Sequence, residues 1–185
     1  SKDLLALVKA VESCVDCATA KSTRVNQSRL FAPESLPCAP NECWFADTTG
    51  KIPVSIDKFK YVVMAGNRES NYYCAQLLAK KSDSNKLIES VDFFGKLHNC
   101  PPKLIVADQG SEFNCARFVA RAHLAGIAVG FTNIKTAAQN GIVERAWRIL
   151  KDSARAMLAA SKLPLAFWSY AMMYSVIVHN ATPQD

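Results

Sequence analysis

The most constraining feature of this sequence is an apolar run that ends in a carboxylate. Residues 103–107 read KLIVA, and Asp108, Gln109 and Gly110 follow directly. Such a run is typical of a buried strand, because strands covered on both faces carry near-continuous apolar sequence. Asp and Gly are also common in turns, so a solvated turn is the simpler interpretation of Asp108 taken alone. The alternative is a reactive group at the C-terminal end of a strand, where open α/β sheets place their sites.

The composition favours a folded chain with a core of its own. Half of the 185 residues are hydrophobic, and 22 basic against 16 acidic side chains give a net charge of +6. This excess weakly favours a polyanionic partner. Seven cysteines without a secretory signal predict a reduced intracellular compartment, and the longest apolar stretch is too interrupted to span a membrane. The sequence opens on Ser1 rather than a methionine, so we expect it to be part of a longer chain.

The order of the predicted elements indicates an α/β protein. Three strand-like runs come first, and helices then alternate with strands, which predicts a mixed sheet covered by helices. A short helix is expected over residues 3–13 and a polar, proline-containing linker before the first strand. Strands are expected at 43–48, 60–65, 71–78, 103–107 and 126–131, and helices at 83–98, 112–124, 142–160 and from Pro164 onward.

Three acidic residues lie where a structural role does not require them. Asp47 ends the run Trp44-Phe45-Ala46, Asp108 ends the run described above, and Glu144 is expected in the first turn of the long helix. Taken singly, Asp47 is a turn former, and Glu144 is favoured by the helix dipole or pairs with Arg148 four residues later. Two aspartates at strand ends and a glutamate on a helix can, however, converge at one edge of a mixed sheet.

These residues carry a family resemblance. The chain resembles the catalytic core of retroelement integrases, and the copia-type retrotransposon integrase is the most similar pattern. The motifs are W-x-x-D ending at Asp47, DQGSEF from Asp108, QNGIVERAWRIL around Glu144 and LPLAFW at 163–168, with 35 residues between Asp108 and Glu144. The resemblance implies a ribonuclease H-like fold with a mixed five-stranded sheet. It divides the chain into the end of a zinc-binding module (1–30), a linker (31–43) and an integrase core (44–185).

The resemblance also implies a chemistry for the three acids. Hard divalent cations prefer carboxylate oxygens, and a pair of such ions stabilises both the attacking and the leaving oxygen of a phosphodiester. By resemblance, Asp47 bridges two Mg²⁺ or Mn²⁺ ions, while Asp108 and Glu144 hold one ion each. The expected activity is metal-dependent joining of the 3′ ends of element DNA to target DNA. The three histidines are interpreted as ordinary surface or core residues.

Candidate DNA contacts surround Glu144. Arg148, Lys151 and Arg155 follow it at spacings of 4, 3 and 4, so the four side chains form one helical stripe. A solvated helix face explains most such stripes, but this one begins at a site that receives DNA. The preceding loop, expected to be mobile, contributes three further candidates for DNA contacts, which are Lys135, Gln139 and Asn140.

Two cysteines suggest a second metal. Cys14 and Cys17 form C-x-x-C and resemble the end of the family's His-His-Cys-Cys zinc module, so a Zn²⁺ site is expected to be half present. A rival arrangement combines them with Cys38 and Cys43 in a four-cysteine site. Cys43 adjoins the strand leading to Asp47, which disfavours that arrangement. Three other cysteines are expected to be small buried residues, namely Cys74, Cys100 and Cys115.

The expected partners follow from the resemblance. They are element and target DNA, further copies of the chain in a homo-oligomer, and the rest of a gag-pol-type polyprotein, with no membrane. The expected location is a cytoplasmic virus-like particle and then the nucleus. Two alternatives remain: a transposase or nuclease of the same fold, and a domesticated, non-catalytic DNA-binding module.

Overall fold

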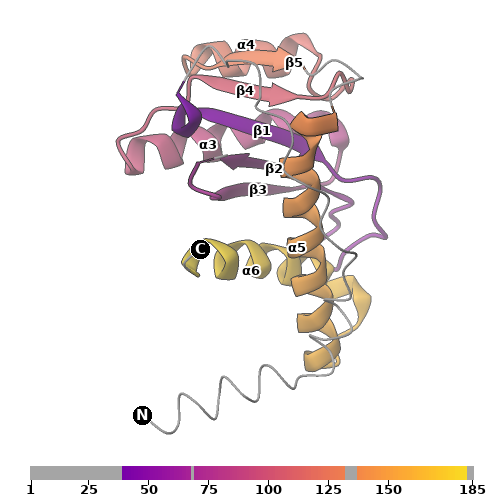
Figure 1. The fold of residues 1–185 in the computed structure, drawn as a ribbon. Coiled ribbons are helices and arrows are strands. Elements are labelled where there is room, and N and C mark those ends of the chain that lie inside the picture. Colours follow the sequence, from indigo (N-terminus) through magenta and orange to yellow (C-terminus); the bar gives the residue numbers. More distant parts are fainter. Residues whose placement is uncertain (1–38, 68, 132–136, 183–185) are drawn as a thin grey trace, which may run out of the picture.

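The computed structural model describes residues 39–67, 69–131 and 137–182 (Figure 1). The predicted helix at 3–13 and nearly all of the predicted zinc module and linker lie outside this part. The described elements, in chain order, are η1 (Pro40–Glu42), β1 (Cys43–Thr48), β2 (Tyr61–Asn67), β3 (Tyr73–Leu78), η2 (Lys81–Lys86), α3 (Leu87–Leu97), β4 (Leu104–Ala107), α4 (Ala116–Leu124), β5 (Ala128–Phe131), α5 (Ala137–Ser161), η3 (Leu165–Phe167) and α6 (Trp168–Ala181).

The five strands form one mixed sheet in the order β3-β2-β1-β4-β5. β1 pairs antiparallel with β2, and β2 with β3, whereas β4 runs parallel to both β1 and β5. Hairpin-like connections join the three antiparallel strands, while the parallel strands require crossovers, which α3 and α4 supply. This confirms the predicted α/β class and is consistent with a ribonuclease H-like fold.

Helices cover both faces of the sheet, so two hydrophobic clusters form. Side chains alternate between faces along each strand: Phe45 of β1 faces α5 and α6, and its neighbour Trp44 faces α3 and α4. The long α5 helix lies across the sheet and extends beyond it, where α6 packs beside it (Figure 1). Burial on both faces explains why the central strands β1, β2 and β4 are largely apolar, whereas the edge strand β5 is partly exposed.

Several element boundaries differ from the sequence-based expectation. α4 begins at Ala116 rather than residue 112, because residues 111–113 form a turn in which Phe113 N donates to Gly110 O at 3.0 Å. α5 begins at Ala137 rather than 142. The prediction that Glu144 occupies the first turn of this helix is therefore wrong, because the helix has already made about two turns before it.

At the β3 edge of the sheet, a side chain from α6 pairs with the first residue of the strand. Asn180 accepts a hydrogen bond from Tyr73 N at 2.9 Å and donates one to Tyr73 O at 2.8 Å, as a neighbouring strand would. The His179 ring stacks on the Tyr73 ring with centroids 4.5 Å apart. An exposed edge strand is a template for unwanted pairing, so this contact protects β3 and fixes the end of α6.

None of the helices that the structure describes, within residues 39–182 and outside the gaps at 68 and 132–136, combines the length and the apolar character needed to cross a bilayer.

The Asn180 contact predicts a measurable loss of stability. Asn180→Ala removes the side-chain partner of a part-buried N–H and a part-buried C=O of Tyr73, so we expect the free energy of unfolding to fall by about 1–3 kcal/mol. Urea denaturation followed by circular dichroism measures this loss. Asn114→Ala, at an exposed asparagine, is the control. Equal effects of the two substitutions would contradict the assigned role of Asn180.

Candidate active site

Two aspartates meet at the carboxyl edge of the sheet. Ala46 of β1 pairs in register with Ala107 of β4, so Asp47 and Asp108 are the next residues on two adjacent parallel strands. By strand alternation both point to the face covered by α5, since Phe45 and Val106 two positions earlier belong to the cluster on that face. The structure thus places these two carboxylates at adjacent strand ends, and their role as metal ligands stays a prediction.

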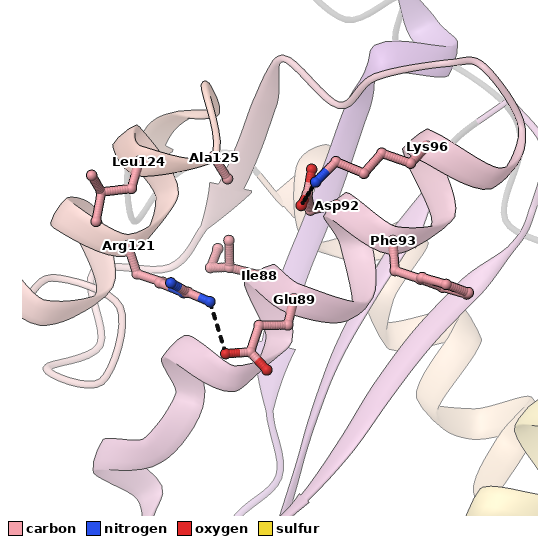
Figure 2. Close-up of a pocket in the computed structure, with 8 residues that line it drawn as sticks. All are labelled: Ile88, Glu89, Asp92, Phe93, Lys96, Arg121, Leu124 and Ala125. Carbon is pink, nitrogen blue, oxygen red and sulfur yellow. Dashed lines mark hydrogen bonds and ion pairs between the residues drawn. The ribbon is translucent and has the colours of Figure 1, made fainter.

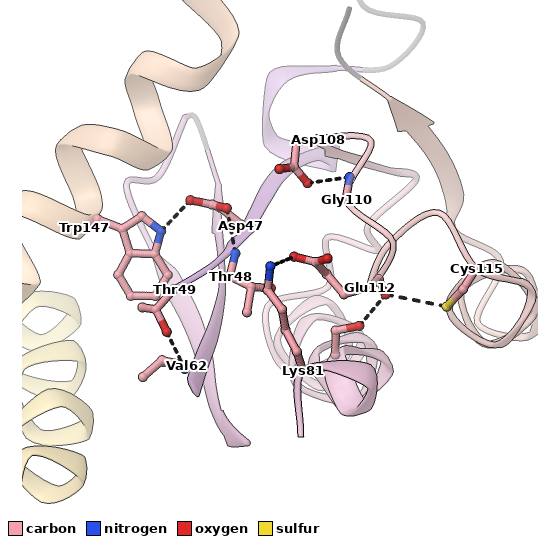
Figure 3. A network of polar contacts seen from close by, with 11 residues as sticks. Asp47, Thr48, Thr49, Val62, Lys81, Asp108, Gly110, Glu112, Cys115 and Trp147 are labelled. Atoms are coloured by element: carbon pink, nitrogen blue, oxygen red, sulfur yellow. Dashed lines mark hydrogen bonds and ion pairs between the residues drawn. The ribbon is translucent and has the colours of Figure 1, made fainter. Parts of the chain in front are cut away.

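Asp47 is held by two hydrogen bonds. Its Oδ1 accepts from the backbone N–H of Thr48 at 2.7 Å, and its Oδ2 accepts from the indole Nε1–H of Trp147 at 2.9 Å. Trp147 belongs to α5 and is buried. The carboxylate therefore links the end of β1 to the long helix (Figure 3).

The environment of Asp47 raises the pKa of its carboxyl group above the ordinary value of 3.8. Burial is the largest cause, because it disfavours the charged form, and repulsion from Asp108 acts in the same direction. The hydrogen bonds from Thr48 and Trp147 and the positive charge of Lys81 lower the pKa and offset part of the rise. Two carboxylates placed close enough to repel each other provide oxygen ligands and negative charge for a cation.

Asp108 is exposed and shapes the turn that follows β4. Its Oδ1 accepts from Gly110 N at 3.1 Å. A side chain at residue 110 would begin 2.9 Å from Asp108 Oδ1 and 2.8 Å from Glu112 Oε2. Gly110 therefore allows two carboxylates to approach the same point of the backbone, and a larger residue there would require these side chains to shift.

Glu112 is a third acidic residue beside this pair. It is buried, and its Oε1 forms an ion pair with Lys81 Nζ, from the start of η2. Figure 3 draws the ammonium group between Glu112 and the strand end that carries Asp47 and Thr48. A positive side chain thus lies within the acidic site.

Glu144 occupies the exposed side of α5, three residues before Trp147. Residues three apart are neighbours on a helix surface, so Glu144 lies one turn from the indole that contacts Asp47. Among the described residues, no three acidic, histidine or cysteine side chains are gathered closely enough to hold a metal ion. The structure thus brings Asp47 and Asp108 to adjacent strand ends and does not gather Glu144 with them, so the three-acid metal site stays a prediction.

The basic stripe is only partly solvated. Arg148 and Arg155 are exposed, and Arg155 pairs with Asp152 at 2.8 Å. Lys151 is half-buried, with its ammonium 5.2 Å from the centroid of the Trp147 ring. Two other candidates for DNA contacts belong to the first turn of α5 rather than to a loop, namely Gln139 and Asn140, while Lys135 lies outside the described residues.

The cysteines form no described metal site. Cys14, Cys17 and Cys38 lie outside the described residues, and Cys43 is fully buried in β1. Burial raises the pKa of the Cys74 thiol to about 12, which keeps it protonated. Cys100 and Cys115, expected to be buried, are half-buried. His123, interpreted as an ordinary surface or core residue, is exposed.

Two of the hollows on the described part of the chain, one with a polar lining and one apolar, lie away from the strand-end aspartates. One, of about 380 Å³, separates α3 from α4 and is lined by Leu124 and by the ion pairs Arg121–Glu89 and Lys96–Asp92 (Figure 2). The other, of about 1010 Å³, is an apolar groove between α6 and the far half of α5. Neither is lined by the strand-end aspartates, so the candidate site is the edge of the sheet that carries these aspartates and not either hollow.

The comparisons with known proteins point to retroelements. The chain is similar to a retrotransposon Pol polyprotein. It is 26% identical over 172 residues to "Retrovirus-related Pol polyprotein from transposon RE2" of Arabidopsis thaliana, and the match covers 92% of this chain and 12% of the polyprotein. No family model matches the chain. The similarity is weak but runs almost end to end, and it relates the chain to a retroelement Pol region.

Sequence analysis missed three residues of the site. Trp147 lies in the same motif as Glu144, three positions later, and its spacing was a usable signal. Glu112 lies within DQGSEF, but nothing in the sequence distinguishes a buried acid from an exposed one there. Lys81 carries no signal at all, because only the fold brings η2 against the turn after β4.

The geometry predicts the effect of Asp108→Asn on its neighbour. The amide keeps the oxygen that accepts from Gly110 N but removes the charge that repels Asp47, so we expect the pKa of Asp47 to fall. NMR titration of the side-chain carboxyl carbons measures this shift. Asp92→Asn, on α3, is the matched control and should leave the Asp47 pKa unchanged.

The same substitution has a pH-dependent effect on stability. The pKa of Asp47 is higher in the folded state than in the unfolded state. The contribution of Asp47 to the free energy of unfolding is therefore fully present below about pH 3.8 and is lost as the pH rises through the folded-state pKa. Asp108→Asn reduces that loss. We expect equal stability of both proteins in acid, and a small gain for the variant at neutral pH without metal. A less stable variant at neutral pH would contradict the repulsion.

Proposed function

We propose that the chain is the catalytic core of a retrotransposon integrase, which joins the 3′ ends of element DNA to target DNA by metal-dependent polynucleotidyl transfer. The observation that carries the proposal is the convergence of Asp47 and Asp108 at the ends of two adjacent parallel strands. Glu144, one helical turn from the Trp147 indole that contacts Asp47, supplies the third acid of the motif. The similarity to a retrotransposon Pol polyprotein supports the same assignment.

The donor set fits divalent cations such as Mg²⁺ or Mn²⁺. Carboxylate oxygens are the ligands that these ions prefer, and the mutual repulsion of Asp47 and Asp108 favours a cation between them. In this proposal Asp47 would be a ligand of both ions, and Asp108 and Glu144 would each be a ligand of one ion. When bound, the ions would activate the attacking hydroxyl group and stabilise the leaving oxygen of the phosphodiester.

The other residues of the site orient these ligands. The Trp147 N–H occupies one lone pair of Asp47 Oδ2 and so fixes the direction of the carboxylate. Gly110 N–H does the same for Asp108. The cations on α5 would receive the DNA backbone, since phosphate contacts supply most of the sequence-independent affinity. No side chain has to act as a nucleophile.

The assignment extends to partners and location. We infer that the chain acts within a longer polyprotein product, on element and target DNA, and as a homo-oligomer. Its expected places of action are a cytoplasmic virus-like particle and then the nucleus. A Zn²⁺ site at Cys14 and Cys17 is part of the same proposal.

Loss of the Asp108 charge should abolish strand joining. A neutral amide is a poor ligand for Mg²⁺, so Asp108→Asn should reduce joining of a labelled oligonucleotide by more than about 100-fold. Changing a residue that only hydrogen-bonds to a metal ligand costs up to about 100-fold, so a larger loss indicates a ligand itself. Circular dichroism checks that the fold is kept, and Asp92→Asn is the matched surface control. A folded Asp108→Asn protein with near wild-type joining would return Asp108 to the role of a turn residue.

The basic stripe makes a separate prediction about DNA affinity. Arg148→Ala with Arg155→Ala should weaken binding to all DNA sequences and lower the slope of log affinity against log salt by about 1 to 2, since each phosphate contact contributes about 0.9. Fluorescence anisotropy without divalent cations measures this slope. The control removes Lys96 and Arg121 from the α3–α4 surface, where they are ion-paired as Arg155 is. An unchanged slope in the stripe variant would make the stripe a solvated helix face.

A further inference from the structure

A lysine ammonium lies among the acidic residues of the site. Lys81 Nζ pairs with Glu112 Oε1, and its charge also acts on Asp47, whose pKa it lowers. The Lys81 side chain is 42% exposed and Glu112 only 6%, so the pair is open to solvent on the lysine side alone. In Figure 3 the ammonium points toward the space beside Asp47 and Asp108.

Glu112 is anchored rather than free to turn away. Its backbone carbonyl accepts from Ser84 Oγ at 2.6 Å, and Cys115 Sγ lies 3.6 Å from the same oxygen. Its second carboxylate oxygen lies 2.8 Å from the position where a side chain on Gly110 would begin. The backbone of Glu112 is thus anchored and its carboxylate is buried, whereas Lys81 is the solvent-exposed member of the pair.

We propose that Lys81 is a resident counter-cation of the acidic site, whose charge opposes the entry of divalent cations and so sets the affinity of the site for them. The inference rests on the metal site of the proposed function. Positive charges close to one another repel, so a divalent ion bound at Asp47 and Asp108 must tolerate the ammonium or displace it toward solvent. Glu112 acts in the opposite sense, because it neutralises that ammonium and adds negative charge.

This role differs from that of an ordinary structural ion pair in what it predicts. A structural pair changes the stability of the protein when it is broken and leaves cation affinity untouched. If Lys81 is a counter-cation, removing its positive charge raises the affinity of the site for divalent cations, and removing the negative charge of Glu112 lowers it. Affinity for Mn²⁺ alone, without DNA or turnover, therefore distinguishes the two roles.

The test is a Mn²⁺ titration followed by isothermal calorimetry or by the electron paramagnetic resonance signal of free Mn²⁺. Lys81→Met keeps the aliphatic stem and removes the charge, so Mn²⁺ should bind on the order of tenfold more tightly, as expected for one unit charge a few ångströms from a divalent ion. Glu112→Gln leaves the ammonium without its partner and should weaken binding several-fold. Lys81→Arg keeps the charge and should stay near wild type.

The double variant guards against a failure to fold. Lys81→Met alone leaves a buried carboxylate unpaired, which can destabilise the protein, whereas Lys81→Met with Glu112→Gln removes both charges. Because its net charge equals that of wild type, its affinity should lie between those of the two single variants. Lys96→Met, which breaks the surface pair with Asp92, is the matched control and should leave Mn²⁺ affinity unchanged.

The outcomes separate this inference from the proposed function. If wild-type protein binds no Mn²⁺, or if Asp108→Asn binds Mn²⁺ as wild type does, the proposed metal site fails and the inference falls with it. If wild-type binding is lost in Asp108→Asn but the charge variants of Lys81 and Glu112 bind as wild type does, only the inference is overturned. Weaker binding by folded Lys81→Met would also overturn it, since Lys81 would then organise the site rather than oppose the cation.

Discussion

The parallel pairing of β1 with β4 is the constraint on which the candidate site depends. Ala46 lies opposite Ala107, so the residue that follows each alanine is an aspartate at the same edge of the sheet. A slip of one residue would turn either aspartate to the opposite face. The register is protected because both faces of both strands are buried, and a slip would expose the side chains of two hydrophobic clusters at once.

The long helix connects this edge to the rest of the core. Its apolar face packs on the sheet, and Trp147 belongs both to that face and to the site. An indole buries a large apolar surface and still carries one donor, which suits a position between core and carboxylate. The energy of core packing thus holds the donor that orients Asp47. Lys151, one turn further along α5, lies over the indole ring.

The sequence was most informative where one interaction dominates. The central strands were predictable because a strand that is buried on both faces has a nearly continuous apolar sequence. The positions of the two strand-end aspartates followed from the order of the strands. Helix starts were less predictable: residues 137–141 read as a polar loop, yet the structure continues α5 through them. The Lys81–Glu112 pair was beyond sequence reasoning. Its partners are 31 positions apart in the chain, and only the packing of η2 against the turn after β4 brings them together.

The charge balance of the site explains why several elements meet there. The ionised form of Asp47 is disfavoured by burial and by Asp108, so the metal-free site reduces stability above the ordinary pKa of the carboxyl group. The groups that offset this cost are the amide of the next residue, a helix indole and the charge of a lysine from η2, and the last two come near Asp47 only when α5 and η2 are folded against the sheet. A ligand that supplies positive charge relieves the same repulsion, and its binding stabilises the folded state by an amount that grows with the logarithm of its affinity. Cation binding and the stability of this edge of the sheet are thus coupled, and residues that tune one, such as Lys81, necessarily tune the other.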